Sequence, residues 1–238
     1  MDFYEVITKR RSVRKYSARP SKEQLDGLRE FLRTVKPLDA GIRVEMIVAG
    51  PESVRKTHAD DAVLFYSESK GDYLLNCGYM LQQVEFYLQT HGIGVCWMGM
   101  GKTTFEAPEG TEHVIMLTFG IAEGSLYREA GDFKRKELKQ LVHPYFANDA
   151  LELARYAPSA VNTQPWRFRD GGDCIHIYQA EPGFILKIAG VFRMNCIDMG
   201  ILLEFLAVIY EHNGKTAVFA KSDAPKISGL TYIISINK

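Results

Sequence analysis

One stretch in the second half of the chain combines several groups that can bind a flat polar ligand. It spans residues 157–168 and reads A-P-S-A-V-N-T-Q-P-W-R-F. A hydroxyl and a carboxamide stand close together in it, and a tight turn can add backbone N–H groups as further donors. The pattern predicts a helix over Asp149–Tyr156 and then a turn. Gln164 precedes a proline, which predicts extended backbone there and a strand after it.

A second stretch with chemical potential lies near the N-terminus. Residues 9–16 read K-R-R-S-V-R-K-Y, so five of eight side chains are cationic in a chain with no net charge. A charge run is usually a solvated turn. Guanidinium groups, however, match phosphate oxygens in a two-pronged fork, and a serine hydroxyl adds another donor. The stretch taken alone therefore leaves both a solvated turn and a cradle for an anion open.

A third stretch is rich in glycine and follows a long apolar helix expected over Asp72–His91. Residues 92–101 read G-I-G-V-C-W-M-G-M-G, and small residues allow a ligand to approach the backbone closely. The same region nearly forms a phosphate-binding P-loop, since C-W-M-G-M-G-K-T differs from G-x-x-x-x-G-K-[ST] only at Cys96. A nucleotide-binding protein is therefore kept as an alternative.

Together the three stretches resemble the motifs of the FMN-dependent nitroreductase family, which are R-R-S-x-R-x-[FY], G-L-G-x-x-W-x-G and A-P-S-x-x-N-x-Q-P-W. The resemblance covers essentially the whole chain and is strongest to the fused "TM" subgroup. It implies an α+β, nitroreductase-like fold. It also implies an NAD(P)H oxidoreductase in which hydride passes through N5 of FMN to an electron-poor acceptor, such as a nitroaromatic or a quinone, in a ping-pong cycle. The alternative within the same resemblance is an FMN-binding or storage protein without catalysis.

The resemblance assigns cofactor contacts in the first half of the chain. Contacts to the phosphate, the ribityl chain and the ring pyrimidine fall to Arg10 or Arg11, to Ser12 and to Arg14. The residues implied at the edge of the flavin near N5 are Met98, Gly99 and Met100.

In the second half the resemblance assigns the ring contacts of the turn and a late phosphate contact. Asn162 is expected, with Arg14, near the N1–O2 edge of the flavin. The basic segment after residue 133 resembles R-K-x-L-x-x-[LV], which gives Arg135 the phosphate contact, although a solvated linker explains this segment equally well. The ring contacts implied in the turn itself are Pro158, Ser159 and Ala160.

The order of these motifs predicts an internal duplication. The pattern N-C-x-x-M-x-x-x-x-E-F begins at Asn76 and again at Asn195, which is 119 residues later and half of the 238-residue chain. The N-terminal half holds the first two motifs and the other half holds the third, although ordinary nitroreductases combine them across a dimer. We therefore expect an intramolecular pseudo-dimer: one intertwined domain with repeat 1 at about 1–125, a linker at about 126–147 and repeat 2 at about 148–238. It would bind one FMN and be a monomer.

Composition limits the remaining classes of function. Lys plus Arg and Asp plus Glu both number 29, which argues against nucleic-acid and membrane-surface partners. The first residues contain no apolar signal segment, so a cytoplasmic protein is expected. Six histidines lack metal-ligand spacing, and no metal site is expected. Four cysteines, without a C-x-x-C motif, are expected to be buried thiols: Cys77, Cys96, Cys174 and Cys196.

Overall fold

The computed structural model describes residues 2–184 and 190–238. The chain divides into two compact units, and the boundary along the sequence falls between Asp132 and Phe133. Among the described residues, none of the helices is both long enough and apolar enough to cross a bilayer. The elements of the first unit are η1 (Phe3–Val6), β1 (Tyr16–Ala18), α1 (Lys22–Leu32), β2 (Val44–Ala49), β3 (Val54–Arg55), β4 (Asp61–Ser67), α2 (Tyr73–Thr90), β5 (Gly94–Met98), β6 (Lys102–Thr103), β7 (Glu112–Ala122) and η2 (Ala130–Asp132).

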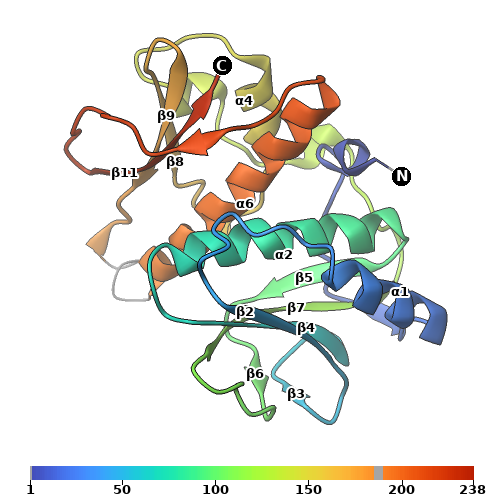
Figure 1. Ribbon diagram of the computed structural model, residues 1–238. Helices are drawn as coiled ribbons and strands as arrows, with labels where there is room; N and C mark the ends of the chain where they lie inside the picture. The colour runs from blue at the N-terminus through green and yellow to red at the C-terminus, as the bar shows by residue number, and fades with distance from the viewer. Residues whose placement is uncertain (1, 185–189) are drawn as a thin grey trace. The chain divides into compact units, whose positions relative to one another are not determined.

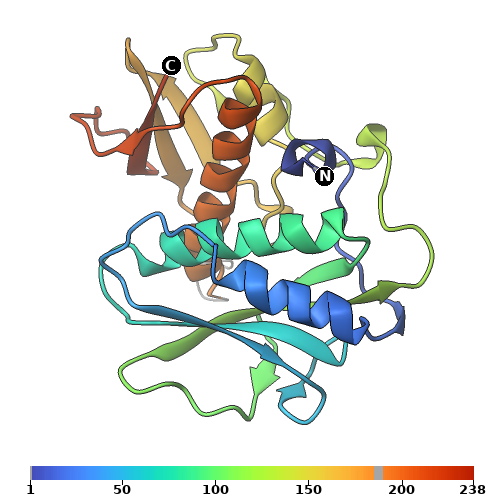
Figure 2. The same ribbon diagram turned by 45° about the vertical axis from the view of Figure 1, so that its right-hand side comes forward.

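The first unit is built on an antiparallel sheet in the order β1-β7-β4-β2, with β5 also paired to β7. Helices α1 and α2 lie on the same face of this sheet (Figures 1 and 2). Helix α1 begins at a capping box, in which Ser21 and Gln24 exchange side-chain-to-backbone hydrogen bonds. Helix α2 is buried over most of its circumference, as its apolar sequence predicts.

The second unit has its own antiparallel sheet, in the order β10-β11-β9-β8. Helices α4 and α6 pack together, and α6 also lies against β9. The apolar sequence of α6 is again buried along most of its length. The elements of this unit are α3 (Leu138–Leu141), α4 (Asp149–Ala154), η3 (Ala160–Asn162), β8 (Trp166–Asp170), β9 (Cys174–Ala180), α6 (Val191–His212), β10 (Phe219–Ala220) and β11 (Leu230–Asn237).

Both units repeat one topology. When β1, β3 and β6 are set aside, the described strands of each unit comprise two before its long helix and two after it, and the strand pairings β5-β7-β4-β2 and β10-β11-β9-β8 follow the same order along the chain. Each long helix is followed by a glycine with positive φ, 76° at Gly92 and 70° at Gly214. The internal duplication expected from the sequence is thus visible in the connectivity of each unit.

The repeated asparagines perform equivalent tasks in the two helices. Asn76 of α2 accepts hydrogen bonds from the backbone N–H groups of Leu38 and Asp39, at 2.8 and 3.1 Å. Asn195 of α6 accepts one from the hydroxyl of Thr163 at 2.9 Å. In each unit, therefore, the asparagine holds the loop that connects a shorter helix to a strand, α1 to β2 in the first unit and α4 to β8 in the second.

Several local predictions are wrong. Gln164 is not extended but has a φ of 48°, because its backbone belongs to the strained turn described below. Cys77 and Cys96 are buried, as expected, whereas Cys174 and Cys196 are only half-buried. Within the segment expected as a linker, 126–147, the chain forms η2 and α3, and Val142 bridges to Phe168 of β8.

Candidate cofactor site

The cationic stretch near the N-terminus forms an arm, residues 9–14, that is docked onto β5. Ser12 forms a parallel bridge with Val95, and the N–H of Val13 donates to the carbonyl of Val95 at 2.8 Å. A Cβ at Gly94 would lie 2.9 Å from the side chain of Val13, so the arm comes this close because residue 94 is glycine. The structure thus joins two of the predicted motifs, because β5 leads directly into residues 98–100.

Four arginines lie in or beside the arm. Arg10 is buried, Arg11 is half-buried and Arg14 is exposed. Arg128, which the sequence did not single out, lies beside them and donates from Nε to the carbonyl of Arg10 at 3.3 Å. Burial and the neighbouring charges of Arg10 and Arg11 lower the pKa of Arg128 to about 10, although Asp132 acts in the opposite direction. This concentration of positive charge is the electrostatic environment that a phosphate requires.

Arg10 is committed to a carboxylate inside the protein. Its Nε donates to Oε1 of Glu85, on α2, at 2.5 Å, and both side chains are 1% exposed. The indole N–H of Trp97 donates to the other oxygen of Glu85 at 2.6 Å, and Gln89 donates to Oε1 at 3.0 Å. Arg10 therefore supports the arm from behind and leaves the outward contacts to the rest of the motif.

The loop after β5 exposes its tip. Met98 packs against the core cluster of the first unit, whereas Gly99 and Met100 are exposed. Burial raises the pKa of the Cys96 thiol, which keeps it protonated and argues against a redox role. The side chain of Met98 thus anchors the loop, and Gly99 and Met100 are its accessible residues.

The P-loop alternative is wrong. In a P-loop the lysine and threonine after the last glycine begin a helix. Here Lys102 and Thr103 form the short strand β6, which pairs with β3. No helix N-terminus is therefore available at this position for a phosphate.

The turn after α4, residues 157–164, is held in an unusual backbone conformation. Val161, Asn162 and Gln164 have φ values of 44°, 56° and 48°, in the left-handed region that non-glycine residues rarely adopt. The N–H of Gln164 donates to the hydroxyl oxygen of Ser159 at 2.9 Å, which closes the turn and leaves the serine able to donate elsewhere. A β-branched residue in this region stores strain, and such strain is typical of ligand-binding segments.

The basic segment before α3 holds this turn from one side. Arg135 donates to Oδ1 of Asn162 at 2.8 Å and to the carbonyl of Tyr156 at 3.1 Å. The amide of Asn162 donates to the carbonyl of Lys134 at 2.9 Å. The structure thus brings together two predicted site residues, Arg135 and Asn162, and shows that both are occupied in shaping the turn.

Helix α6 holds the turn from the other side. Both oxygens of Asp198 accept the N–H of Ala160, at 3.0 and 3.1 Å, and Asn195 receives the hydroxyl of Thr163. Asp198 is 4% exposed, and burial raises its pKa well above the ordinary value, although the hydrogen bond from Ala160 lowers it. The acidic side chain is thus a buried support of the turn that the sequence reading missed.

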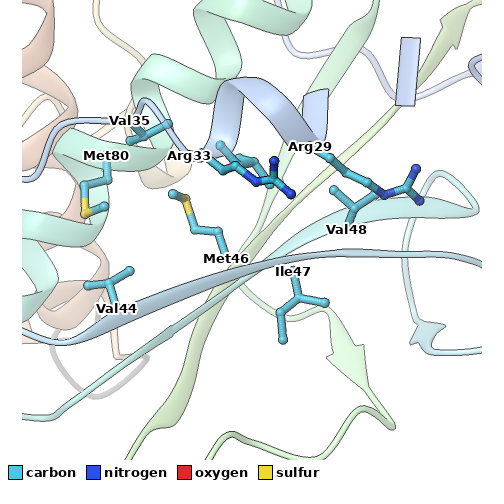
Figure 3. Close-up of a pocket in the computed structure, with 9 residues that line it drawn as sticks. Arg29, Arg33, Val35, Val44, Met46, Ile47, Val48 and Met80 are labelled. Carbon is cyan, nitrogen blue, oxygen red and sulfur yellow. The ribbon is translucent and has the colours of Figure 1, made fainter. Parts of the chain in front are cut away.

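The first unit also contains an open cavity of about 520 Å³ between α1 and β2 (Figure 3). Its floor is apolar, with Val44, Met46 and Val48 on β2, and Arg29 and Arg33 of α1 stand beside it. Each arginine pairs with an acidic neighbour of its own helix, Asp26 or Glu30. None of the predicted cofactor contacts lines the cavity, so it is separate from the arm and the loop.

Comparison with known protein families shows to which family the chain belongs. Residues 2–208 match the protein family described as "Putative TM nitroreductase". The chain belongs to this nitroreductase family. The expectation taken from its three motifs is confirmed. A comparison with curated proteins found no match.

Solved structures confirm the nitroreductase fold. A "putative nitroreductase" of Thermotoga maritima superimposes with a TM-score of 0.68 at 19% identity, over 100% of this chain and 94% of its own. Smaller chains match only partly. A nitroreductase family protein of Clostridium difficile covers 62% of this chain at 17% identity with a TM-score of 0.49, over 100% of its own length. An "FMN-dependent Nitroreductase" of C. difficile covers 60% at 17% identity with a TM-score of 0.43, over 97% of its own length.

Sequence reasoning missed the residues of this nitroreductase that support the motifs from within. Three of them, Glu85, Asn195 and Asp198, are polar side chains buried within the long apolar helices α2 and α6. An isolated carboxylate in such a helix needs buried partners, and that signal was available from the sequence. The other two are Arg128, which lies beside the arm, and Gln164, which closes the turn.

Replacing Val161 by glycine should stabilise the protein. The side chain is 76% exposed, so little burial is lost, and relief of the left-handed strain outweighs the extra freedom of glycine in the unfolded chain. We expect the free energy of unfolding, measured by chemical denaturation, to rise by about 1 kcal/mol. The matched variant Val218→Gly, at an exposed valine without positive φ, should instead lower it. Equal losses in both variants would contradict strain at residue 161.

Replacing Asp198 by asparagine should change the pH dependence of stability. Because the folded protein raises the pKa of this carboxyl, the unfolded chain loses the proton first, and stability falls as pH rises above the ordinary pKa of about 4. Asparagine can still accept the N–H of Ala160 but has no proton to lose. Chemical denaturation between pH 4 and 8 should show that the free energy of unfolding of the variant increases relative to that of the wild type as pH rises. Exposed Asp173→Asn is the control, and parallel curves for Asp198→Asn would refute the prediction.

Proposed function

We propose that the chain is an FMN-dependent NAD(P)H oxidoreductase of nitroreductase type. The observation that carries the proposal is the cationic arm docked on β5. It places Arg11, Ser12 and Arg14 directly beside the strand that leads into the exposed loop at residues 98–100. Membership in the nitroreductase family and the fold support it. Bound FMN would supply the N5 centre through which hydride passes from NAD(P)H to an electron-poor acceptor, in two separate half-reactions.

The residues present fit the phosphate of such a cofactor. Arg11 and Arg14 offer guanidinium forks, and Ser12 offers a hydroxyl whose oxygen lies 3.4 Å from a nitrogen of Arg10. Burial, and after it the charges of Arg10 and Arg11, lower the pKa of Arg128, and a phosphate dianion beside these guanidinium groups would offset their mutual repulsion. Arg10 would contribute charge from behind the arm, through its pair with Glu85.

The residues of the turn fit a planar polar ring. Ser159 can donate its hydroxyl while it accepts from Gln164, and Asp198 holds the backbone N–H of Ala160, directly before the strained residues. Asn162 and Arg135 would hold the turn in shape rather than act alone, because their side chains bind each other. We expect the chain to bind one FMN and to act as a monomer with a small-molecule acceptor.

The proposal is tested by the visible spectrum of the purified protein, before and after NADH or NADPH is added without oxygen. We expect a flavin spectrum, with one FMN per chain by quantitation, that bleaches with one of the two nucleotides. A flavin spectrum that neither nucleotide bleaches would favour an FMN-binding or storage protein. No flavin, even after FMN is added, would refute the proposal. Two FMN per chain would contradict the single site.

Replacing Arg14 by alanine should weaken FMN binding at least about tenfold, the effect of losing a hydrogen bond between charged groups. Arg14 is exposed, so its loss should leave the melting temperature unchanged. Lys15→Ala is the matched control, since it removes the adjacent exposed cation of the same stretch and should change affinity less than threefold. The measurement is FMN titration followed by flavin fluorescence. Equal effects of the two substitutions would show that only general charge matters.

A further inference from the structure

The buried carboxylate of Glu85 lies where the two motifs of the first unit meet. It is fully buried in α2 and accepts hydrogen bonds from Arg10 Nε at 2.5 Å and Trp97 Nε1 at 2.6 Å. Arg10 belongs to the arm, and Trp97 is the last residue but one of β5 before the exposed loop. One side chain thus ties both segments to the same helix.

The contacts around Glu85 extend further along the arm. Gln89, one turn later on α2, donates to Glu85 at 3.0 Å and to the carbonyl of Arg11 at 3.3 Å. The hydroxyl of Tyr127 donates to the carbonyl of Gln89 at 2.8 Å. The arm is therefore held by side chains and by its backbone bridge to β5 together. Buried charge-assisted hydrogen bonds fix geometry more strictly than apolar packing, because both partners lose much if they move apart.

We infer that Glu85 is a positioning residue of the cofactor site, which fixes the distance between the phosphate-binding arm and the loop at residues 98–100. This inference rests on the proposed function, since it assumes that both segments bind the same FMN. Glu85 does not touch the ligand in this assignment. It acts through Arg10 on the arm and through Trp97 on the loop.

The opposite explanation is electrostatic, and it predicts a different sign. Glu85 is a negative charge in contact with Arg10, whose backbone carbonyl accepts from Arg128 and which precedes Arg11 in the cationic stretch. If it acted only through its charge, its removal would leave more positive potential for a phosphate, and FMN would bind more tightly. If Glu85 positions the two segments, its removal loosens them, and FMN binds more weakly. The direction of the change in affinity therefore separates the two roles.

The experiment compares Glu85→Gln with the wild type by FMN titration, well below the melting temperature of either protein. We expect the dissociation constant to rise about tenfold or more. Trp97→Phe removes the N–H donor but keeps an aromatic ring, and it should also weaken binding. The double variant should lose no more FMN affinity than the single variant that binds FMN less tightly, because both substitutions break the same link.

A readout without flavin follows the link itself. The chain has two tryptophans, so ¹⁵N-labelled tryptophan gives two indole signals, and Trp97→Phe identifies one of them. In the FMN-free wild type the Trp97 indole proton should lie far downfield and exchange slowly, as expected for a short bond to a carboxylate. In Glu85→Gln it should move upfield and exchange faster. An unchanged indole signal would show that the link does not exist in solution and would overturn the inference.

Glu204→Gln is the matched control. It removes the same group from the repeat-equivalent position of α6, where Glu204 is also buried, in the half that carries neither the arginine-rich motif nor the W-x-G motif. It should lower the melting temperature as Glu85→Gln does, but leave FMN affinity within about twofold of the wild type.

The outcomes separate the inference from the proposed function. If the wild-type chain does not bind FMN, the proposed function fails and takes this inference with it. If the wild type binds FMN but Glu85→Gln binds it equally well, only the inference fails, and a lower melting temperature alone would then mark Glu85 as purely structural. Tighter binding in Glu85→Gln would also overturn the inference, in favour of the electrostatic role.

Discussion

The structure depends on polar side chains buried in two apolar helices. A buried carboxylate or carboxamide is costly unless hydrogen bonds satisfy it, so each of these groups fixes whatever segment supplies its partners. In α2, Glu85 fixes the arm and β5, and Asn76 fixes the loop at Leu38 and Asp39. In α6, Asp198 and Asn195 fix the turn. The helices thus provide both the core of each unit and the reference points for its functional loops.

The duplication shows which parts of an ancestral unit are retained for folding and which have diverged. Strand order, the buried helix, the glycine after it and the loop-fastening asparagine occur in both halves. The cationic arm and the W-x-G segment occur in the first, and the strained turn occurs in the second. Features that satisfy the core are kept in both units because each unit must fold. Features directed to a ligand are needed once if one cofactor is bound.

Strain and excess charge accumulate in the same segments that the family resemblance marks. The turn holds three non-glycine residues at positive φ, and beside the arm burial together with the charges of Arg10 and Arg11 lowers the pKa of Arg128. Both features oppose folding, and each is compensated by nearby buried contacts. Such local costs are the expected consequence of shaping a site before its ligand arrives. The cavity between α1 and β2, by contrast, has paired arginines and no strained backbone of this kind.

Motif spacing and apolar periodicity are properties of consecutive residues, so the family, the fold class, the duplication and the long helices could be predicted from the sequence. The hydrogen-bond partners of the motif residues, by contrast, follow only from the fold. Arg10 turns inward because Glu85, 75 residues away, lies beside it, and Asn162 is held by Arg135 across a loop. Gln164 does not adopt the extended backbone expected before proline, because hydrogen bonds to Ser159 and Lys136 hold it in a tighter turn. These outcomes depend on partners that are distant in sequence, and local pattern cannot supply them.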